Sequence, residues 1–229
     1  MELLITHTSA LDYWRLCGAA PLNHDRRQRR RVAPSSPPDI SLARQLNKLG
    51  LRYPIRAMVS KPQVRRTSRK LISSVSCGPL PEGCIVDVGG GLFVASPELC
   101  FFQMTRELSL AKLLELGLEL CGSYALPVPG VNYGEAAIAE RRLYGKDRLT
   151  DTSKLEAFLA RTSGMYNQRY LPKILQRITD NSASPMETKL FVLLTLPYKL
   201  GGFGFEMPEL NAKISPSKSA KKISTKKFF

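Results

Sequence analysis

Positive charge is concentrated at the two ends of this chain, and this distribution limits which segments can form a buried core. Residues 1–70 carry 15 Lys or Arg against 4 acids, and residues 210–229 carry 6 Lys and no acid. Residues 71–209 carry 13 basic and 15 acidic residues, a net charge of −2. Because such like charges repel one another and resist burial, we expect an exposed arginine-rich loop near the N-terminus and a disordered lysine tail.

The remaining composition predicts a globular protein without a membrane span. The 229 residues suffice for one large or two small domains, and 43% of them are hydrophobic. No stretch of about eighteen residues is free of charge, and the first residues do not resemble a secretory signal. The odd number of cysteines and the absence of zinc-ligand spacing predict free thiols in the reducing cytoplasm. These cysteines are Cys17, Cys77, Cys84, Cys100 and Cys121.

Local patterns predict strands in the first half and helices in the second. Helices are expected at 9–18, capped by Ser9, and at 42–49, capped by Asp39 or Ser41. Strands are expected at 52–60, 71–77, 83–88 and 91–95, and Gly89–Gly91 favours a hairpin turn over a phosphate-binding loop. A helical stretch is expected from Pro97 to near Gly122, as one bent helix or two, followed by a loop at 125–134. Further helices are expected at 153–164, 165–179 and 185–196; Ser153 caps the first of these and Ser184 the last.

The basic clusters predict contact with nucleic acid. Arginine binds phosphate oxygens with its planar fork, and each neutralised phosphate releases counterions. No aromatic residue lies within these clusters, which favours contact with the phosphate backbone over base stacking. A solvated loop and tail are the alternative. The candidate phosphate ligands are Arg26, Arg27, Arg29, Arg30 and Arg31, then Arg65, Arg66, Arg69 and Lys70.

The sequence offers few groups for catalysis. His7 and His24 are the only histidines, and neither has a partner that the sequence identifies. Glu187 lies three residues after Ser184, a spacing typical of a helix capping box. Helix capping is therefore the first interpretation of Glu187, and a catalytic carboxylate is the second.

Three stretches together resemble a known bacterial family. Residues 5–15 resemble the start of proteins related to AbiEi-type antitoxins, and residues 93–104 with 115–124 are similar to their middle helical segment. Residues 182–188, then Leu196-Pro197 and 201–205, look like the start of a fused endonuclease domain. That domain resembles the very-short-patch-repair branch of the restriction-endonuclease-like, or PD-(D/E)XK, superfamily.

The resemblance implies metal-dependent DNA cleavage in complete relatives. In that superfamily an acidic residue on the first helix joins an Asp and a Glu-x-Lys set to hold a divalent metal such as Mg²⁺. Only Glu187 matches one of these positions, as a vestigial catalytic residue, because no Asp follows Asp180 and no Glu-x-Lys follows Glu209. We therefore expect a truncated, inactive nuclease with no complete metal site and no cofactor of its own.

The expected fold is mixed α/β, with the start of an incomplete restriction-endonuclease-like fold. An α+β antitoxin-like module spans 1–124 and includes a basic loop at 24–38; a helical section spans 125–181. The first nuclease-like helix lies in 182–212, and 213–229 is the lysine-rich tail. The apolar face of this helix is expected to be exposed unless a partner covers it: Met186, Leu190, Leu193 and Leu194.

The leading functional hypothesis is a truncated endonuclease-like protein that still binds DNA. The alternatives are an antitoxin-like transcriptional regulator, with a cognate toxin as a further partner, and a basic RNA-binding protein. Arg29→Ala with Arg30→Ala is expected to lower the affinity for all DNA sequences alike.

Overall fold

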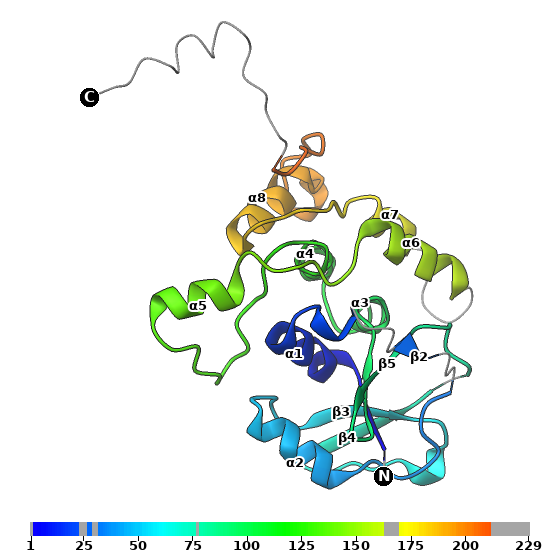
Figure 1. Cartoon of the computed structure of the whole chain (residues 1–229). Coiled ribbons are helices and arrows are strands. Elements are labelled where there is room, and N and C mark those ends of the chain that lie inside the picture. Colours follow the sequence, from blue (N-terminus) through cyan, green and yellow to red (C-terminus); the bar gives the residue numbers. More distant parts are fainter. Residues whose placement is uncertain (1, 23–26, 29–31, 77, 163–169, 212–229) are drawn as a thin grey trace, which may run out of the picture.

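Three apolar residues near the N-terminus form the strand around which the sheet is built. This strand, β1 (Leu3–Ile5), pairs in parallel with β6 (Leu92–Ala95) and antiparallel with β3 (Ile55–Val59). All three residues of β1 are buried. The computed structural model describes residues 2–22, 27–28, 32–76, 78–162 and 170–211 (Figure 1). No strand is predicted here from the sequence, because three residues are too few to show alternation.

Within the described residues the sheet is six-stranded and mixed, with the order β2-β5-β6-β1-β3-β4. At one edge β2 (Arg27–Gln28) pairs antiparallel with β5 (Ile85–Gly89). At the other edge β4 (Leu71–Val75) pairs in parallel with β3. The mixed α/β fold class predicted from the sequence is therefore confirmed. The predicted exposed loop is wrong at Arg27–Gln28, where backbone pairing with β5 makes a strand despite the run of arginines.

Glycines make the turn between β5 and β6, as the sequence predicts. The two strands are antiparallel, and Gly89, Gly90 and Gly91 all have positive φ angles. The Asp87 carboxylate accepts a hydrogen bond from the Gly89 N–H at 2.8 Å. The chain reverses direction here instead of entering a helix, so this segment is a hairpin turn and not a phosphate loop.

The first helices begin at caps of different kinds. Helix α1 (His7–Cys17) begins two residues before the predicted start, and Thr6 at its cap makes no side-chain cap bond. Ser9 is therefore no cap; its hydroxyl accepts a hydrogen bond from the Arg56 N–H of β3 at 2.9 Å. Helix α2 (Ile40–Lys48) is capped by Asp39, one of the two expected caps.

The segment from Pro97 to Leu120 is two helices. Helix α3 (Pro97–Met104) is capped by Ser96, and helix α4 (Leu110–Leu120) is capped by Ser109. Each serine hydroxyl accepts a backbone N–H of the first turn. The second cap explains why the chain starts a new helix instead of bending one.

Four further helices follow among the residues that the structure describes. They are α5 (Ala136–Leu143), α6 (Thr152–Arg161), α7 (Leu171–Leu175) and α8 (Pro185–Thr195). Helix α5 was not expected, and α6 is capped by Asp151 rather than Ser153 because the Asp151 carboxylate accepts the Lys154 N–H at 2.8 Å. Residues 165–169 of the predicted 165–179 helix, and residues 163–164 at the end of the predicted 153–164 helix, lie outside the described residues. Short 3₁₀ turns occur at Ala20–Leu22, Pro62–Val64 and Tyr198–Leu200.

One hydrophobic core joins the sheet to the C-terminal helices. The same cluster of buried side chains contains β1, α3 and α4 together with Phe158 of α6 and Phe191 of α8. The rings of Phe102 and Phe158 stack with their centroids 4.8 Å apart. The core thus continues across both section boundaries drawn from the sequence, at 124/125 and 181/182.

Two further expectations concern cysteines and membrane spans. Cys100 and Cys121 are buried free thiols, as predicted, and burial raises the pKa of both. Cys77 lies outside the described residues. Among the described helices, none is long and apolar enough to cross a membrane.

The central position of β1 leads to a stability prediction. Ile5→Ala removes a fully buried side chain from the middle of the sheet and should lower the free energy of unfolding by about 3 kcal/mol. Ile138→Ala, on the exposed side of α5, should change it by less than about 0.5 kcal/mol. Urea unfolding followed by circular dichroism measures both. Equal effects would contradict the central role of β1.

Candidate functional site

Residues 61–70, the basic arm, fold back along the edge of the sheet. After the 3₁₀ turn at Pro62–Val64, the chain runs antiparallel to β4. Arg66 and Ser73 are joined three times: the Ser73 N–H and hydroxyl both donate to the Arg66 carbonyl, and the Arg66 N–H donates to the Ser73 hydroxyl. The Ser68 N–H donates to the Leu71 carbonyl at 2.7 Å. These bonds attach the basic arm to the sheet as a short outer strand.

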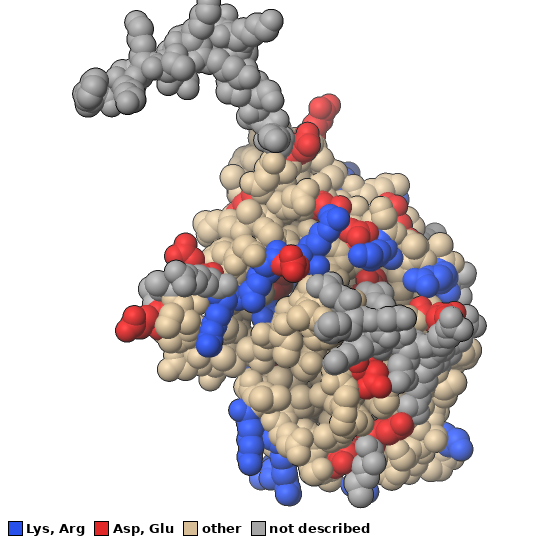
Figure 2. All heavy atoms as spheres, in the orientation of Figure 1, with Lys and Arg blue, Asp and Glu red and all other residues tan. Residues whose placement is uncertain are grey.

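The basic arm presents cations that no carboxylate of the described residues neutralises. Residues 40–81 contain nine Lys or Arg and no acid. Of these, Arg52 pairs with Asp12 and Arg56 pairs with Glu107. The cations of the arm itself are all exposed and form no ion pair among the described residues: Lys61, Arg65, Arg66, Arg69 and Lys70. In Figure 2 some Lys and Arg side chains project from the lower left of the molecule, where Figure 1 shows helix α2.

Arg65 is fixed in place more firmly than its neighbours. Its Nε donates to the Ser73 carbonyl at 3.1 Å, across the hairpin. This bond uses one of the five guanidinium N–H groups and leaves the other four available to a ligand. The basic arm therefore combines a fixed backbone with charged side chains that point to solvent.

Arg27, the member of the first basic cluster that the structure describes, lies far along the sheet from the second cluster. Arg27 lies in β2, at the edge opposite β4, and five strand intervals separate the two edges. That separation is roughly 24 Å. Arg26, Arg29, Arg30 and Arg31, and also His24, lie outside the described residues. Arg65, Arg66, Arg69 and Lys70 are brought together, and Lys61 joins them because the 3₁₀ turn folds the chain back.

Glu187 performs the capping role that its spacing predicts. Its N–H donates to the Ser184 hydroxyl at 3.1 Å, and its carboxylate accepts the Ala183 N–H. The Asn211 side-chain amide donates to both carboxylate oxygens, at 3.1 and 3.3 Å. Among the described residues there is no group of three or more His, Cys, Asp or Glu that could hold a metal ion.

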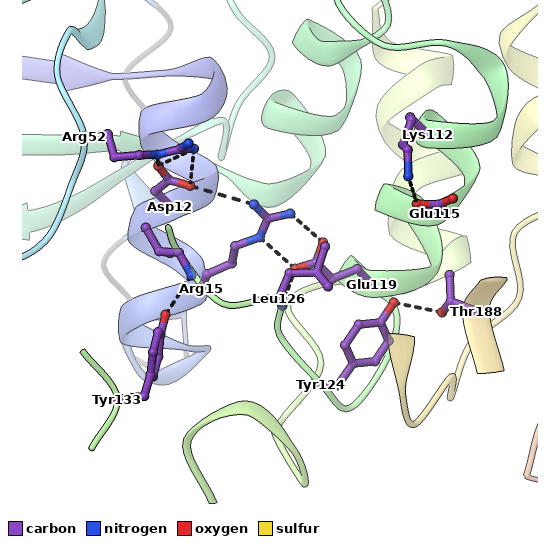
Figure 3. Close-up of polar contacts among 11 residues, drawn as sticks. Asp12, Arg15, Arg52, Lys112, Glu115, Glu119, Tyr124, Leu126, Tyr133 and Thr188 are labelled. Atoms are coloured by element: carbon purple, nitrogen blue, oxygen red, sulfur yellow. Dashed lines mark hydrogen bonds and ion pairs between the residues drawn. The ribbon is translucent and has the colours of Figure 1, made fainter. Parts of the chain in front are cut away.

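A buried ion pair joins α1 to α4 (Figure 3). Arg15 donates from Nε and from one terminal nitrogen to the two oxygens of Glu119, at 2.8 and 2.7 Å. The Glu119 side chain is 3% exposed. Its carboxylate also accepts the Leu126 N–H at 2.9 Å. A bidentate pair with a further backbone donor satisfies the carboxylate almost completely, as its burial requires.

Asp12 extends this network toward the sheet. Its carboxylate lies 3.8 Å from Arg15 and 3.2 Å from Arg52. Burial raises the pKa of the Asp12 carboxyl, and the two arginines oppose that shift. A hollow of about 220 Å³ lies beside these residues, between α1 and α4. Because its charges already pair with one another, the network is suited to holding elements together rather than to binding a charged ligand.

His7 adopts a backbone conformation that is uncommon for its residue type. Its φ is 51°, at the junction of β1 and α1. Its N–H donates to the Gln103 amide oxygen at 3.0 Å, and its Nδ1 lies 3.0 Å from the Thr6 hydroxyl. Burial lowers the pKa of the imidazole. The sequence did not identify Gln103 as a partner of His7, because the two residues are 96 positions apart.

Comparison of the chain with protein-family models, curated proteins and solved structures gave no match. The resemblance to antitoxin-related and endonuclease-like proteins therefore stays a prediction.

The Arg15–Glu119 pair leads to a second stability prediction. Glu119→Gln removes the bidentate counter-charge of Arg15 and leaves it only the more distant Asp12 carboxylate at 3.8 Å, so it should lower the free energy of unfolding by about 3 kcal/mol. Glu115, on the same helix, pairs with Lys112, whose side chain is 59% exposed. Glu115→Gln should therefore lower the free energy of unfolding by less than about 0.5 kcal/mol. Denaturant unfolding measures both, and equal costs would refute the distinction.

The lowered pKa of His7 predicts a dependence of stability on pH. The unfolded chain takes up a proton as the pH falls through 6.5, the ordinary value, before the folded protein does. Stability is therefore fully present above that pH and decreases below it. His7→Asn should flatten this decrease, since asparagine tolerates a positive φ and does not titrate. Thermal unfolding of both proteins between pH 5 and pH 8 measures this loss of stability. If the variant loses as much stability with falling pH as the parent protein, His7 is not its cause.

Proposed function

We propose that this protein binds nucleic acid, with DNA as the preferred ligand, through the basic arm. The observation that supports the proposal is the set of five exposed cations on a hydrogen-bonded hairpin, in a stretch of the chain without any acid. Surface cations of ordinary proteins are commonly interspersed with carboxylates. A concentrated, unneutralised cluster attracts polyanions and gains free energy from counterion release.

The composition of the basic arm favours contact with phosphate over contact with bases. Three of its five cations are arginines, whose forks match two phosphate oxygens at once. Residues 61–70 contain no aromatic side chain on which a base could stack. We therefore propose a binding mode that positions the protein on the phosphate backbone with little sequence preference.

The proposal assigns no catalytic step to this chain. Glu187 is the residue that matches the endonuclease-like pattern. Its carboxylate accepts the Ala183 N–H at the start of α8 and a hydrogen bond from the Asn211 side-chain amide. A relationship to antitoxin-related proteins is compatible with DNA binding alone. The free cysteines among the described residues fit the cytoplasm as the compartment, where thiols stay reduced.

Removal of the arm's cations tests the proposal. The triple variant Arg66→Ala, Arg69→Ala and Lys70→Ala keeps Arg65, whose Nε supports the hairpin. The variant should bind duplex DNA more weakly, and the slope of log affinity against log salt should decrease in magnitude by about 3. Fluorescence anisotropy over a salt series measures both quantities.

The matched control removes the same charge elsewhere. Arg106→Ala, Arg142→Ala and Lys199→Ala replaces two exposed arginines and one exposed lysine outside the arm, and should leave the slope unchanged. Equal losses in the two triple variants would contradict a localised site. Tighter binding of RNA than of duplex DNA would favour the RNA-binding alternative, and selective binding to the protein's own promoter would favour the regulator.

A further inference from the structure

Helix α8 exposes an apolar stripe to solvent. Met186, Leu190 and Leu193 are spaced four and three residues apart, so they lie on one face of the helix. They are 72%, 54% and 45% exposed, while Phe191 and Val192 on the opposite face are buried. The exposed face predicted from the sequence is thus confirmed, with Leu194 less exposed than the other three.

The segment after α8 continues this apolar surface. The Phe203 N–H donates to the Leu193 carbonyl and the Phe205 N–H donates to the Leu194 carbonyl, both at 2.9 Å. The two phenylalanine rings are parallel within 13°, with centroids 6.2 Å apart. Both rings are about half exposed. The stripe of α8 and residues 198–207 therefore form one continuous surface, which we call the apolar face.

The apolar face has a groove beside the α8 stripe, which forms its ridge. A groove of about 670 Å³ lies between the end of α8, helix α7 and the start of α4. Its walls include Leu110, Ile174, Pro197, Leu200, Phe205 and Met207. Phe205 belongs to the groove wall and stacks on Phe203, so the ridge and the groove adjoin.

We infer that the apolar face is the interface of a symmetric homodimer. Eight large apolar side chains on it are 40–74% exposed and together expose on the order of 900 Å². A stable interface needs about 800 Å² per partner, and monomers seldom expose more than a few hundred Å² in one patch. The eight are Met186, Leu190, Leu193, Tyr198, Leu200, Phe203, Phe205 and Met207.

The shape of the face fits a second copy of the same chain. A two-fold axis requires a surface that complements itself, so that a ridge on each protomer meets a groove on the other. The stripe of α8 supplies the ridge, and the adjacent 670 Å³ groove supplies the hollow. Homodimer interfaces are also more apolar than other surfaces, which matches the eight side chains of the face; Lys173, Arg177 and Glu206 line the groove as well.

Electrostatic repulsion does not oppose this arrangement strongly. The whole chain has a net charge of +15, but the face lies within residues 71–209, whose net charge is −2. Figure 1 shows α8 at the end of the molecule opposite β3, β4 and α2. Pairing through α8 would therefore keep the basic arms of the two protomers apart, beyond a Debye length of about 10 Å.

Light scattering coupled to size exclusion tests the inference on the full chain, after nucleic acid is removed at high salt. The parent protein should have about twice the monomer mass of 25.5 kDa. Leu190→Glu places a charge in the interface and should give a monomer with an unchanged circular dichroism spectrum. Leu49→Glu makes the same substitution at a 67% exposed leucine at the C-terminal cap of the distant helix α2 and should stay dimeric.

Each other outcome overturns the inference. A parent protein that is monomeric at every concentration excludes the dimer and leaves the face to a different occupant, whether another protein or residues 212–229 of the same chain. A Leu190→Glu variant that remains dimeric excludes this face as the interface. Because the measurement contains no nucleic acid, its result is independent of DNA binding by the basic arm.

Discussion

The buried pair of Arg15 and Glu119 is the contact on which the arrangement of the molecule depends. Arg15 belongs to α1, which follows the central strand, and Glu119 belongs to α4, which leads into the C-terminal half. The same carboxylate holds the chain at Leu126, and Asp12 links the network to Arg52 just before β3. Because a bidentate pair tolerates little rotation, these bonds fix the helices relative to the sheet.

This fixed core separates two surfaces of opposite character. The basic arm is attached to β4, an edge strand, and consists of cations without carboxylate partners among the described residues. The apolar face is formed by α8 and the segment after it, at the far end of the molecule (Figure 1). A dimer formed through the apolar face would present two basic arms at once. Two linked sites bind a long polyanion more tightly than one, because the second contact becomes intramolecular.

The sequence predicted the elements whose signals are local. Asp39 and Ser184 cap the helices that follow them, and the glycines at 89–91 make a hairpin turn, because capping and turn formation involve only nearby backbone. Strands β1 and β2 were missed, since a strand of two or three residues is defined by its partners and not by its own pattern. Ser9 was misassigned for the same reason: its partner is Arg56, 47 residues away.

The candidate site was predicted in part. The cluster at Arg65, Arg66, Arg69 and Lys70 is visible as a charge run, and the exposed stripe on α8 follows from helical spacing. The pairing of Arg15 with Glu119 spans 104 positions, so no local pattern indicates it. The sequence also could not show that Arg27 and the basic arm lie at opposite edges of one sheet.

Lysine footprinting on the protein–DNA complex tests the central claim most directly. With saturating duplex DNA at low salt, an acylating reagent should modify Lys61 and Lys70 of the basic arm much more slowly than in the free protein. Lys189 and Lys199, both exposed and on α8 or just after it, should react at unchanged rates. Protection of Lys189 and Lys199 instead of the arm, or no protection at any lysine of the arm, would contradict the account.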